Sequence, residues 1–333
     1  MSDIKKLLIL GNSSSVHTDN LKSLVEGYFT QTVILDNKDF SLHSPLKLIK
    51  AVRNAKKLLN SFQPSFIILY QIGVAAFFIS FLNRKTPVLA VGIGSDILTV
   101  ADKSFFNKFF VRYVIKHSNY FNAGSIAIKE KMQSLANRPI EITIANLGTD
   151  DILPQKKQNI IFSNRLHKDL YNINHIIDAF AEFLKDNKNK DWKLIIAATG
   201  KEQEYMQQVR NLGIEKNTEF VGWLDKQQNA YYYSISKIWV SLPQSDSISI
   251  SLLEAMSAGC LPVCYDVKAL EGFLANNKNA VIVNDFNENF FERAVNLISD
   301  DIIALNRKTA RQFSDKETNR QRFYSIFDKE FNN

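Results

Sequence analysis

The chain has 333 residues, of which 45% are hydrophobic and 23% are charged, with 12 Gly and 7 Pro. This length usually exceeds one hydrophobic core, and the composition excludes disordered and fibrous proteins. The formal net charge of +7 favours anionic partners such as nucleotide phosphates, acidic lipids or nucleic acid. The N-terminus lacks the pattern of a signal peptide, so we expect a cytoplasmic protein.

Strand-like and helix-like patterns alternate along the first half of the chain. Short apolar runs predict strands, and amphipathic runs predict helices. We expect strands at residues 7–10, 32–35, 66–70, 87–91, 120–123 and 140–144, and helices at 18–29, 46–62 and 74–83. This alternation predicts a parallel sheet with helices on both faces, which binds ligands at the carboxyl ends of its strands.

Residues 66–82 form a nearly continuous apolar run, close to the minimum length for crossing a bilayer. Gln71 and Gly73 divide the run into a short strand-like part and a helix-like part. We therefore predict a strand and a helix here instead of a membrane span.

Residues 104–116 combine aromatic and aliphatic side chains with Lys108, Arg112 and Lys116 at helical spacing. Two interpretations fit this pattern. The favoured one is a helix packed on the core with a basic outer side, and the alternative is a helix that lies on a membrane surface.

A polar segment at residues 151–158 carries Pro154 and two lysines, and it predicts a linker between domains. Beyond it the alternation restarts. We expect strands at residues 160–163, 193–198, 218–221, 238–241 and 262–265, and helices at 173–185, 203–212, 227–234 and 252–258. The prediction is an α/β chain with one Rossmann-like domain at 1–150, a second at 159–314, and a C-terminal helix at 315–333 that packs back toward the first.

Several common catalytic motifs are absent from the sequence. No Gly-x-Gly-x-x-Gly follows the first strand, and no Gly-Lys-Ser/Thr phosphate loop occurs. His-Glu-x-x-His and Gly-x-Ser-x-Gly are absent too. Dinucleotide oxidoreduction, P-loop hydrolysis, zinc proteolysis and serine hydrolysis therefore lose their main sequence support.

The most informative stretch is SDSISISLLEAMSAG at residues 245–259, which follows a predicted strand and enters a predicted helix. A turn of small residues at a helix N-terminus offers backbone N–H groups and a positive dipole end, which suit a diphosphate. Asp246 and Glu254 could accept hydrogen bonds from sugar hydroxyls. Taken alone, the two acids also fit an ordinary helix cap and a solvated helix carboxylate.

The longer run SLPQSDSISISLLEAMSAGCLPVCYD resembles the donor-site signature of the retaining glycosyltransferases of family 4. Four further segments resemble that family in the same order: PSFIILYQIGVAAFFISFLNRKTPVLAVGIGSDIL, IANLGTD, IIFSNRL and FVGWLD. The resemblance implies the GT-B fold, with two Rossmann-like domains facing a central cleft. It also implies transfer of a sugar from a nucleoside diphosphate sugar to a hydroxyl, usually with retention and without a metal or another cofactor.

The resemblance implies a donor-binding role for one set of residues. Arg165 matches the Arg that binds the diphosphate, Glu254 matches the carboxylate that holds the ribose, and Asp246 replaces the usual Glu at the donor sugar. The family's Lys has no direct match, and Lys168 is a candidate substitute. The full set is Gly11, Arg165, Lys168, Gly200, Trp223, Leu224, Asp246, Ser247, Ile248, Ser249, Ile250 and Glu254.

The catalytic candidates are Arg165, Asp246 and Asp96, and the acceptor-binding candidates are His17 and Asp96. Asp96 matches the acid of the family's Gly-Ser-Asp, although Asp is also a favoured residue in turns and helix caps. His17 could orient an acceptor, although a single His is more often structural or solvated. No residue is assigned as a general base.

The expected donor is a UDP-sugar, with GDP as the alternative base. The expected acceptor is a glycan or lipid-linked precursor of a surface polysaccharide or lipopolysaccharide, met at the inner face of the cytoplasmic membrane by peripheral contact with anionic lipid. Nucleic acid is not expected, because no binding motif interrupts the two-domain pattern. The alternatives are a GT-B sugar-nucleotide epimerase and a catalytically silent GT-B binding or scaffold protein.

Overall fold

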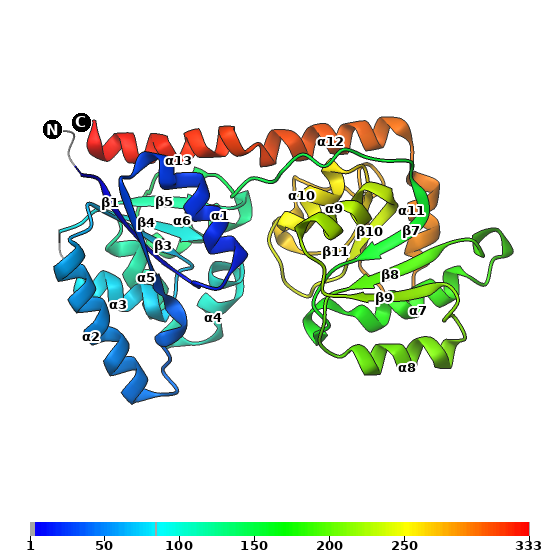
Figure 1. Cartoon of the computed structure of the whole chain (residues 1–333), viewed down its shortest axis with the longest axis horizontal. Helices are drawn as coiled ribbons and strands as arrows, with labels where there is room; N and C mark the ends of the chain where they lie inside the picture. Colours follow the sequence, from blue (N-terminus) through cyan, green and yellow to red (C-terminus); the bar gives the residue numbers. More distant parts are fainter. Residues whose placement is uncertain (1–3, 84, 333) are drawn as a thin grey trace. The chain divides into compact units, whose positions relative to one another are not determined.

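The computed structural model describes residues 4–83 and 85–332. The chain forms two compact units (Figure 1). The first unit extends to Gly148 and also includes the C-terminal segment from Lys316, and the second unit is Thr149–Asp315. Among the described residues, no helix combines the length and the apolar character that crossing a bilayer requires.

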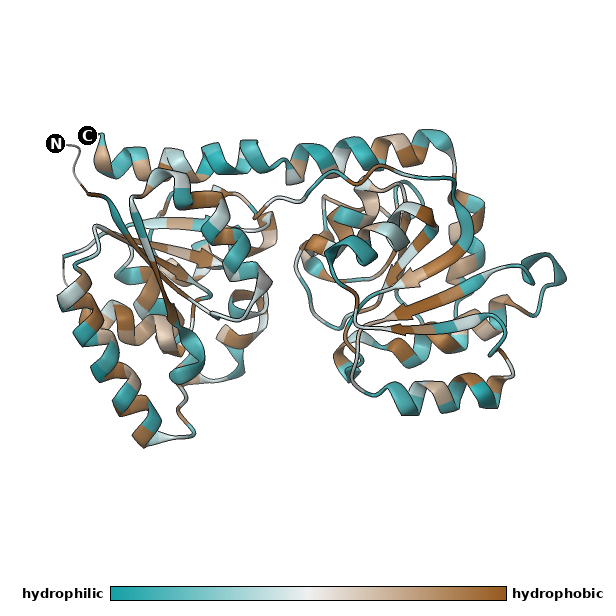
Figure 2. Ribbon diagram, viewed as in Figure 1, coloured by the Kyte–Doolittle hydropathy of each residue, from teal (hydrophilic) through white to brown (hydrophobic). Residues whose placement is uncertain are grey.

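The first unit contains a parallel sheet of six strands in the order β2-β1-β3-β4-β5-β6. The strands are β1 (Lys6–Gly11), β2 (Gln31–Asp36), β3 (Phe66–Tyr70), β4 (Val88–Gly92), β5 (Tyr120–Ala123) and β6 (Thr143–Ile144). Every residue of β3 and β4 is buried, because helices cover both faces of a parallel sheet. Figure 2 shows these strands in brown, the colour of hydrophobic residues.

The helices of the first unit divide between the two faces of its sheet. They are α1 (Val16–Val25), α2 (Pro45–Phe62), α3 (Val74–Leu82), α4 (Ala101–Lys103), α5 (Phe105–Lys116), α6 (Ile126–Ala136) and α13 (Lys316–Phe331). Helices α2, α3 and α5 lie side by side in one layer (Figure 1). The C-terminal helix α13 packs against α1, and its Phe323, Ile326 and Phe327 are buried.

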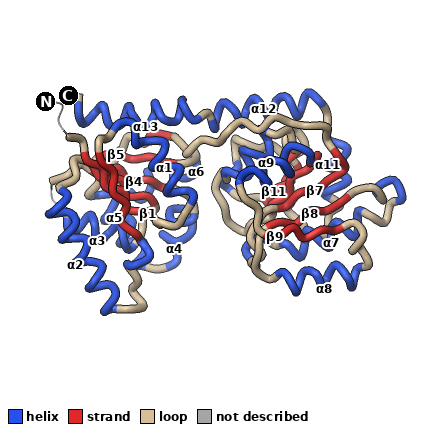
Figure 3. The backbone as a smooth tube through the Cα atoms, in the orientation of Figure 1, coloured by secondary structure: helices blue, strands red, loops and turns tan. Residues whose placement is uncertain are grey.

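The second unit contains another parallel sheet of six strands, in the order β12-β11-β10-β7-β8-β9. The strands, drawn red in Figure 3, are β7 (Gln158–Ser163), β8 (Lys193–Ala197), β9 (Thr218–Gly222), β10 (Ser236–Ser241), β11 (Leu261–Tyr265) and β12 (Val281–Val283). The helices are α7 (Ile173–Phe183), α8 (Glu202–Leu212), α9 (Lys226–Ile235), α10 (Ile250–Ser257), α11 (Phe290–Leu297) and α12 (Asp300–Ser314). Two parallel sheets with covering helices confirm the predicted α/β class.

The apolar run at residues 66–82 is divided as predicted. Strand β3 ends at Tyr70, Gln71 takes the left-handed conformation with φ 81°, and α3 begins at Val74. Other bounds differ from the predictions. The strand expected at 140–144 is shortened to Thr143–Ile144, and the helix expected at 18–29 ends at Val25 and is followed by a single 3₁₀ turn.

Asp151 anchors the segment that precedes β7 to the second unit. Its carboxylate accepts hydrogen bonds from the Ser257 hydroxyl (2.8 Å) and from Nη2 of Arg311 (2.7 Å). These hydrogen bonds lower the pKa of Asp151 below its usual value, the Arg311 bond most strongly. The predicted linker therefore makes specific contacts with the unit that follows it.

Candidate active site

Topology gathers most of the predicted donor-binding residues at one edge of the second sheet. Strands β10, β7, β8 and β9 are neighbours and run parallel, so the loops that follow them leave from the same edge. Arg165 follows β7, Gly200 follows β8, Trp223 follows β9 and Asp246 follows β10. Residues spread over about eighty positions of sequence therefore share one edge.

Arg165 and Asp246 form an ion pair at this edge. Nη2 of Arg165 lies 2.5 Å from Oδ2 of Asp246, and the two side chains are 11% and 22% exposed. The guanidinium also lies over the Tyr171 ring, 4.6 Å from its centre. Nε of Arg165 is buried and has no hydrogen-bond partner among the described residues. The guanidinium is therefore oriented by two neighbours and still has donor capacity to offer to an anion.

The loops after β7 and β8 are fastened together through His167. The backbone N–H of His167 donates to the carbonyl of Thr199 (3.0 Å), and its own carbonyl accepts from Lys201 (3.1 Å). Gly200 has φ +146°, and a Cβ there would lie 2.4 Å from the His167 carbonyl oxygen. Only glycine fits this close approach, which gives Gly200 a structural reason for its identity.

The loops after β7 and β10 are also joined. The Asn172 side chain donates to the carbonyl of Leu242 (2.8 Å), and the N–H of Gln244 donates to the carbonyl of Leu170 (2.9 Å). Asn172 holds the left-handed conformation with φ 52°. These bonds fix the position from which Asp246 reaches Arg165.

Helix α10 begins two residues earlier than expected, at Ile250, with Ser249 as its N-cap. The Ser249 hydroxyl accepts from the N–H of Leu252 (3.3 Å), and the N–H of Ser247 donates to the Asp246 carboxylate (2.9 Å). N–H groups in the first turn of a helix have no acceptor within the helix. Ile250 and Ser251 therefore present the N–H groups that a phosphate oxygen could accept.

A polar network lies behind this helix end. The buried Tyr233 hydroxyl accepts from the Asn164 side chain (2.6 Å) and is hydrogen-bonded to Ser251. Burial, followed by the negative charge of Glu254, raises the pKa of Tyr233 above its usual value. Glu254 therefore lies close to this network, on the same helix as Ser251.

Asp246, Ser247 and Ser249 help to line a small cavity. The cavity has a volume of about 10 Å³, and Cys264 and Ser241 also line it. This volume is close to that of one water molecule and far below that of a ligand pocket. Ile248 is half-buried in the loop after β10 and packs against the core.

The loop after β9 presents one exposed and one buried apolar residue. Trp223 is 69% exposed, whereas Leu224 packs into the core. Asp225 then caps α9 in a reciprocal capping box with Gln228. Lys168 is exposed on the loop after β7.

The remaining predicted residues, Gly11, His17 and Asp96, belong to the first unit. Gly11 ends β1, and a Cβ at this position would lie 2.9 Å from two atoms of Thr18, so glycine permits close packing of α1. His17 is exposed in the first turn of α1.

Asp96 is buried, with 2% of its surface exposed. Its carboxylate accepts the backbone N–H groups of Ile72 (2.9 Å) and Gly94 (2.8 Å), and also that of Ile93. Burial raises its pKa to about 6, against the opposing effect of these hydrogen bonds. The geometry favours the second of the two sequence-based interpretations, in which Asp96 orders the loops after β3 and β4.

Four residues of this edge were not among the predicted ones: Asn164, His167, Tyr171 and Tyr233. Asn164 and His167 flank the Arg-Leu pair that the sequence did single out, so proximity was the available signal. Tyr171 and Tyr233 act through packing and hydrogen bonding with distant residues, for which the sequence carries no signal.

Comparison with known proteins agrees with this geometry. The family model described as glycosyl transferases group 1 matches residues 150–320. No curated protein sequence matches the chain. Among solved structures, HepE from Anabaena in complex with UDP-glucose is 15% identical, with a TM-score of 0.75 over 97% of this chain and 99% of that one.

Two further structures show the same fold. The lipopolysaccharide outer core galactosyltransferase WaaB is 15% identical, with a TM-score of 0.70 over 97% of this chain and 99% of that one. Sucrose-phosphate synthase from Thermosynechococcus elongatus is 12% identical, with a TM-score of 0.77 over 98% and 99%. The fold is GT-B, and the chain belongs to the glycosyl transferases group 1 family.

Proposed function

We propose that the protein transfers a hexosyl or similar sugar from a nucleoside diphosphate sugar to a hydroxyl of a glycan or lipid-linked acceptor. UDP is the proposed nucleotide, and retention of configuration is the proposed outcome. The pathway we propose is the synthesis of a surface polysaccharide or lipopolysaccharide. The observation that carries the proposal is the convergence of Arg165, Asp246 and the N-terminus of α10 at one edge of the second sheet.

In this proposal the second unit stabilises the leaving diphosphate. Charge develops on the diphosphate as its bond to the sugar breaks, and donors aimed at that position lower the barrier. Arg165 would supply its guanidinium, and Ile250 and Ser251 would supply N–H groups at the positive end of α10. Lys168 and Gly200 stand on the adjacent loops, where phosphate oxygens would come within their reach.

The rest of the donor is assigned to residues around this centre. Glu254 would bind the ribose hydroxyls, Trp223 and Leu224 would contact the base, and Asp246 with its following residues would hold the sugar. Asp246 is one methylene shorter than the acid usual in family 4, so we expect it to influence which sugar is accepted. Gly11 would allow the first unit to approach the donor, and His17 would orient the acceptor.

The choice of UDP and of the pathway has support from two structural neighbours. HepE was solved with UDP-glucose, and WaaB is named as a lipopolysaccharide galactosyltransferase. Membership of family 4, and with it retention, is supported by the sequence resemblance.

Two other functions make different predictions in one assay. An epimerase would convert a sugar nucleotide without any acceptor, and a silent binding protein would bind a donor without turnover. Incubation with UDP-, GDP- and ADP-sugars, with and without membrane or glycan extracts, separates them. Nucleoside diphosphate released only when acceptor is present supports transfer.

The decisive variants are Arg165→Ala and Glu254→Ala. We expect Arg165→Ala to lower kcat/KM by about a hundredfold to a thousandfold, because one donor to the developing charge is lost. Glu254→Ala should raise the KM for the donor by about tenfold to a hundredfold, because a hydrogen bond to a charged group is lost.

The matched controls are Arg210→Ala and Glu215→Ala, which change exposed residues of the same unit away from this edge. Both should stay within about twofold of the unmodified protein. Near-normal kinetics of Arg165→Ala and Glu254→Ala in folded protein would contradict the site assignment. Thermal shifts with UDP, GDP, ADP and CMP identify the base, because a ligand that binds only the folded state raises its apparent stability.

A further inference from the structure

All four exposed phenylalanines of the described residues lie on two neighbouring helices of the first unit. Phe105, Phe106 and Phe109 of α5 are 81%, 68% and 47% exposed, and Phe81 of α3 is 57% exposed. Phe77 connects the two helices, since its ring centre lies 5.9 Å from that of Phe109 and 6.3 Å from that of Phe81. A patch of exposed aromatic side chains is typical of a surface that binds another molecule or a membrane.

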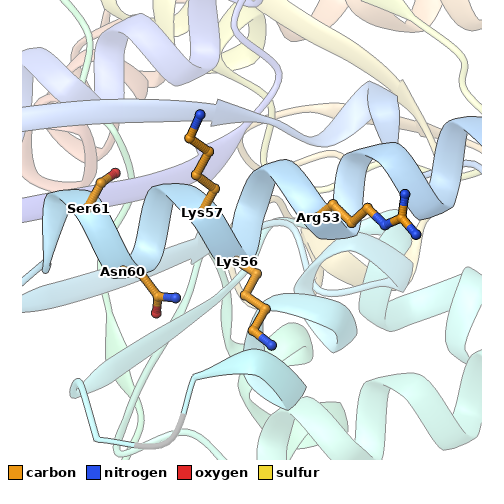
Figure 4. A pocket seen from close by; sticks show the side chains of 5 residues that line it. All are labelled: Arg53, Lys56, Lys57, Asn60 and Ser61. Atoms are coloured by element: carbon orange, nitrogen blue, oxygen red, sulfur yellow. The ribbon is translucent and has the colours of Figure 1, made fainter.

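The neighbouring helix α2 carries a strong positive charge. It contains Lys47, Lys50, Arg53, Lys56 and Lys57 and no acidic residue. No ion pair involves any of these five side chains within residues 4–83 and 85–332. Arg53, Lys56 and Lys57 line a surface hollow of about 510 Å³, and Figure 4 shows their side chains extending from α2. These cations are therefore available to an anionic partner.

The aromatic and basic residues belong to one layer. Helix α2 packs on α3, and α3 packs on α5, all on one face of the sheet (Figure 1). Ala51 and Ala55 of α2 and Val114 of α5 are buried against the core, so the opposite sides of these helices face outward together. We use the name α2–α5 face for the outward sides of α2, α3 and α5.

Acidic residues are rare throughout this region. The sequence has no Asp or Glu from residue 40 to residue 95. The next two acids do not offset the charge of the face, since Asp96 is buried and Asp102 is paired with Lys131. The outer side of α5 adds Arg112 and Lys116, both exposed. The α2–α5 face is therefore positive as well as aromatic.

We propose that the α2–α5 face binds the surface of a bilayer that contains anionic phospholipid. The phenylalanines of α3 and α5 insert at the level of the acyl chains, and the Lys and Arg side chains meet the headgroup phosphates. A nucleic acid duplex would match the charge but would leave four phenylalanines in water. The inference deepens the proposed function, on which it rests for the acceptor, because a lipid-linked acceptor would be met at this face.

Sedimentation of the full chain with vesicles tests the inference. We expect the protein to pellet with vesicles of phosphatidylcholine and phosphatidylglycerol, to remain in the supernatant with phosphatidylcholine alone, and to dissociate as salt is raised. Two variants test the aromatic and the basic side chains of the face separately. The first is Phe105→Ser with Phe106→Ser, and the second is Lys50→Glu with Arg53→Glu and Lys57→Glu. Each should weaken vesicle binding by at least about tenfold.

The matched control reverses the charge at three exposed lysines of the second unit: Lys193→Glu, Lys216→Glu and Lys278→Glu. It changes the net charge as much as the α2 variant does, and it should bind vesicles as the unmodified protein does. Thermal unfolding of each variant shows whether it is folded.

Three results would overturn the inference. They are equal sedimentation with both kinds of vesicle, vesicle binding of the two variants that equals that of the unmodified protein, and a loss of vesicle binding in the control as large as in the α2 variant. Tighter binding to a DNA duplex than to anionic vesicles, insensitive to the Phe substitutions, would assign the face to nucleic acid instead. Donor binding is measured on the same preparations. Unmodified protein that binds UDP but does not pellet with anionic vesicles contradicts this inference alone. Unmodified protein that pellets with anionic vesicles but binds no sugar nucleotide contradicts the proposed function alone.

Discussion

The loop after β4 and the loop after β10 each present an Asp at the carboxyl edge of a parallel sheet, and their surroundings differ. Asp96 is buried, and three backbone N–H groups donate to its carboxylate. Asp246 is partly exposed and pairs with Arg165. A carboxylate surrounded by amides holds loops in place, whereas one paired with a guanidinium at an open edge can exchange that partner for a ligand. Equivalent positions in two similar sheets thus support different roles.

The largest expected effect is on the free energy of unfolding, and it distinguishes Asp96 from Asp246. Asp96→Ala should lower the free energy of unfolding of the first unit by about 4 kcal/mol, because buried N–H groups lose their acceptor. All 3 tryptophans, Trp192, Trp223 and Trp239, belong to the second unit. Urea unfolding that is monitored both by circular dichroism and by tryptophan fluorescence therefore distinguishes the two units.

We expect the Asp96→Ala transition to shift in circular dichroism and to stay in place in tryptophan fluorescence. Asp246→Ala should shift the transition in tryptophan fluorescence, by a smaller amount, since solvent reaches its side chain. Equal shifts of both transitions in both variants would remove the distinction between the two acids.

The second effect is a dependence of stability on pH, which Asp96 causes. Burial raises the pKa of folded Asp96 to about 6 from an ordinary value of 3.8, so the folded state holds this proton more tightly than the unfolded state does. The contribution of the protonated carboxyl to stability is full below about pH 4 and is lost as pH rises through 6. The loss amounts to about 3 kcal/mol.

Asp96→Asn is the reference for this measurement, because the amide cannot ionise. The difference in unfolding free energy between the unmodified protein and Asp96→Asn should decline by this amount between pH 4 and pH 7.5, as followed by circular dichroism. A constant difference over that range would show that the carboxyl keeps an ordinary pKa.

The smallest effect concerns the coupling between Arg165 and Asp246. A double-mutant cycle of Arg165→Ala and Asp246→Ala, measured by tryptophan fluorescence in urea, should give a coupling of about 1–2 kcal/mol. The pair Lys185 and Glu182 is the control, since its side chains are 73% and 59% exposed. Exposed pairs contribute about 0.5 kcal/mol or less. Equal couplings in the two cycles would show that the Arg165 pair is an ordinary surface contact.

Sequence patterns predicted most of the fold, because buried parallel strands produce short apolar runs and their crossover helices produce amphipathic ones. They missed α6, in which the mostly polar run IKEKMQSL buries only Ile128, Met132 and Leu135. They also missed α11, α12 and β12, where the elements are short or strongly charged.

Only those parts of the candidate site that have a local sequence pattern were predictable. The strand-turn-helix pattern at residues 236–257 is local, so the sequence revealed the helix end and its small residues. The pairing of Arg165 with Asp246 joins residues 81 positions apart. Burial of Asp96 depends on how loops after two different strands fold over it. Neither feature has a local signature, and both required the tertiary structure.

The return of the chain to the first unit has a consequence for synthesis. Phe323, Ile326 and Phe327 of α13 are buried there, and Phe327 lies 4.9 Å from Phe29, ring centre to ring centre. A ribosome delivers these residues only after it has made all of the second unit. The first unit therefore keeps an apolar surface uncovered while the second unit is being made, and during that interval chaperones have a binding site that is later covered by α13.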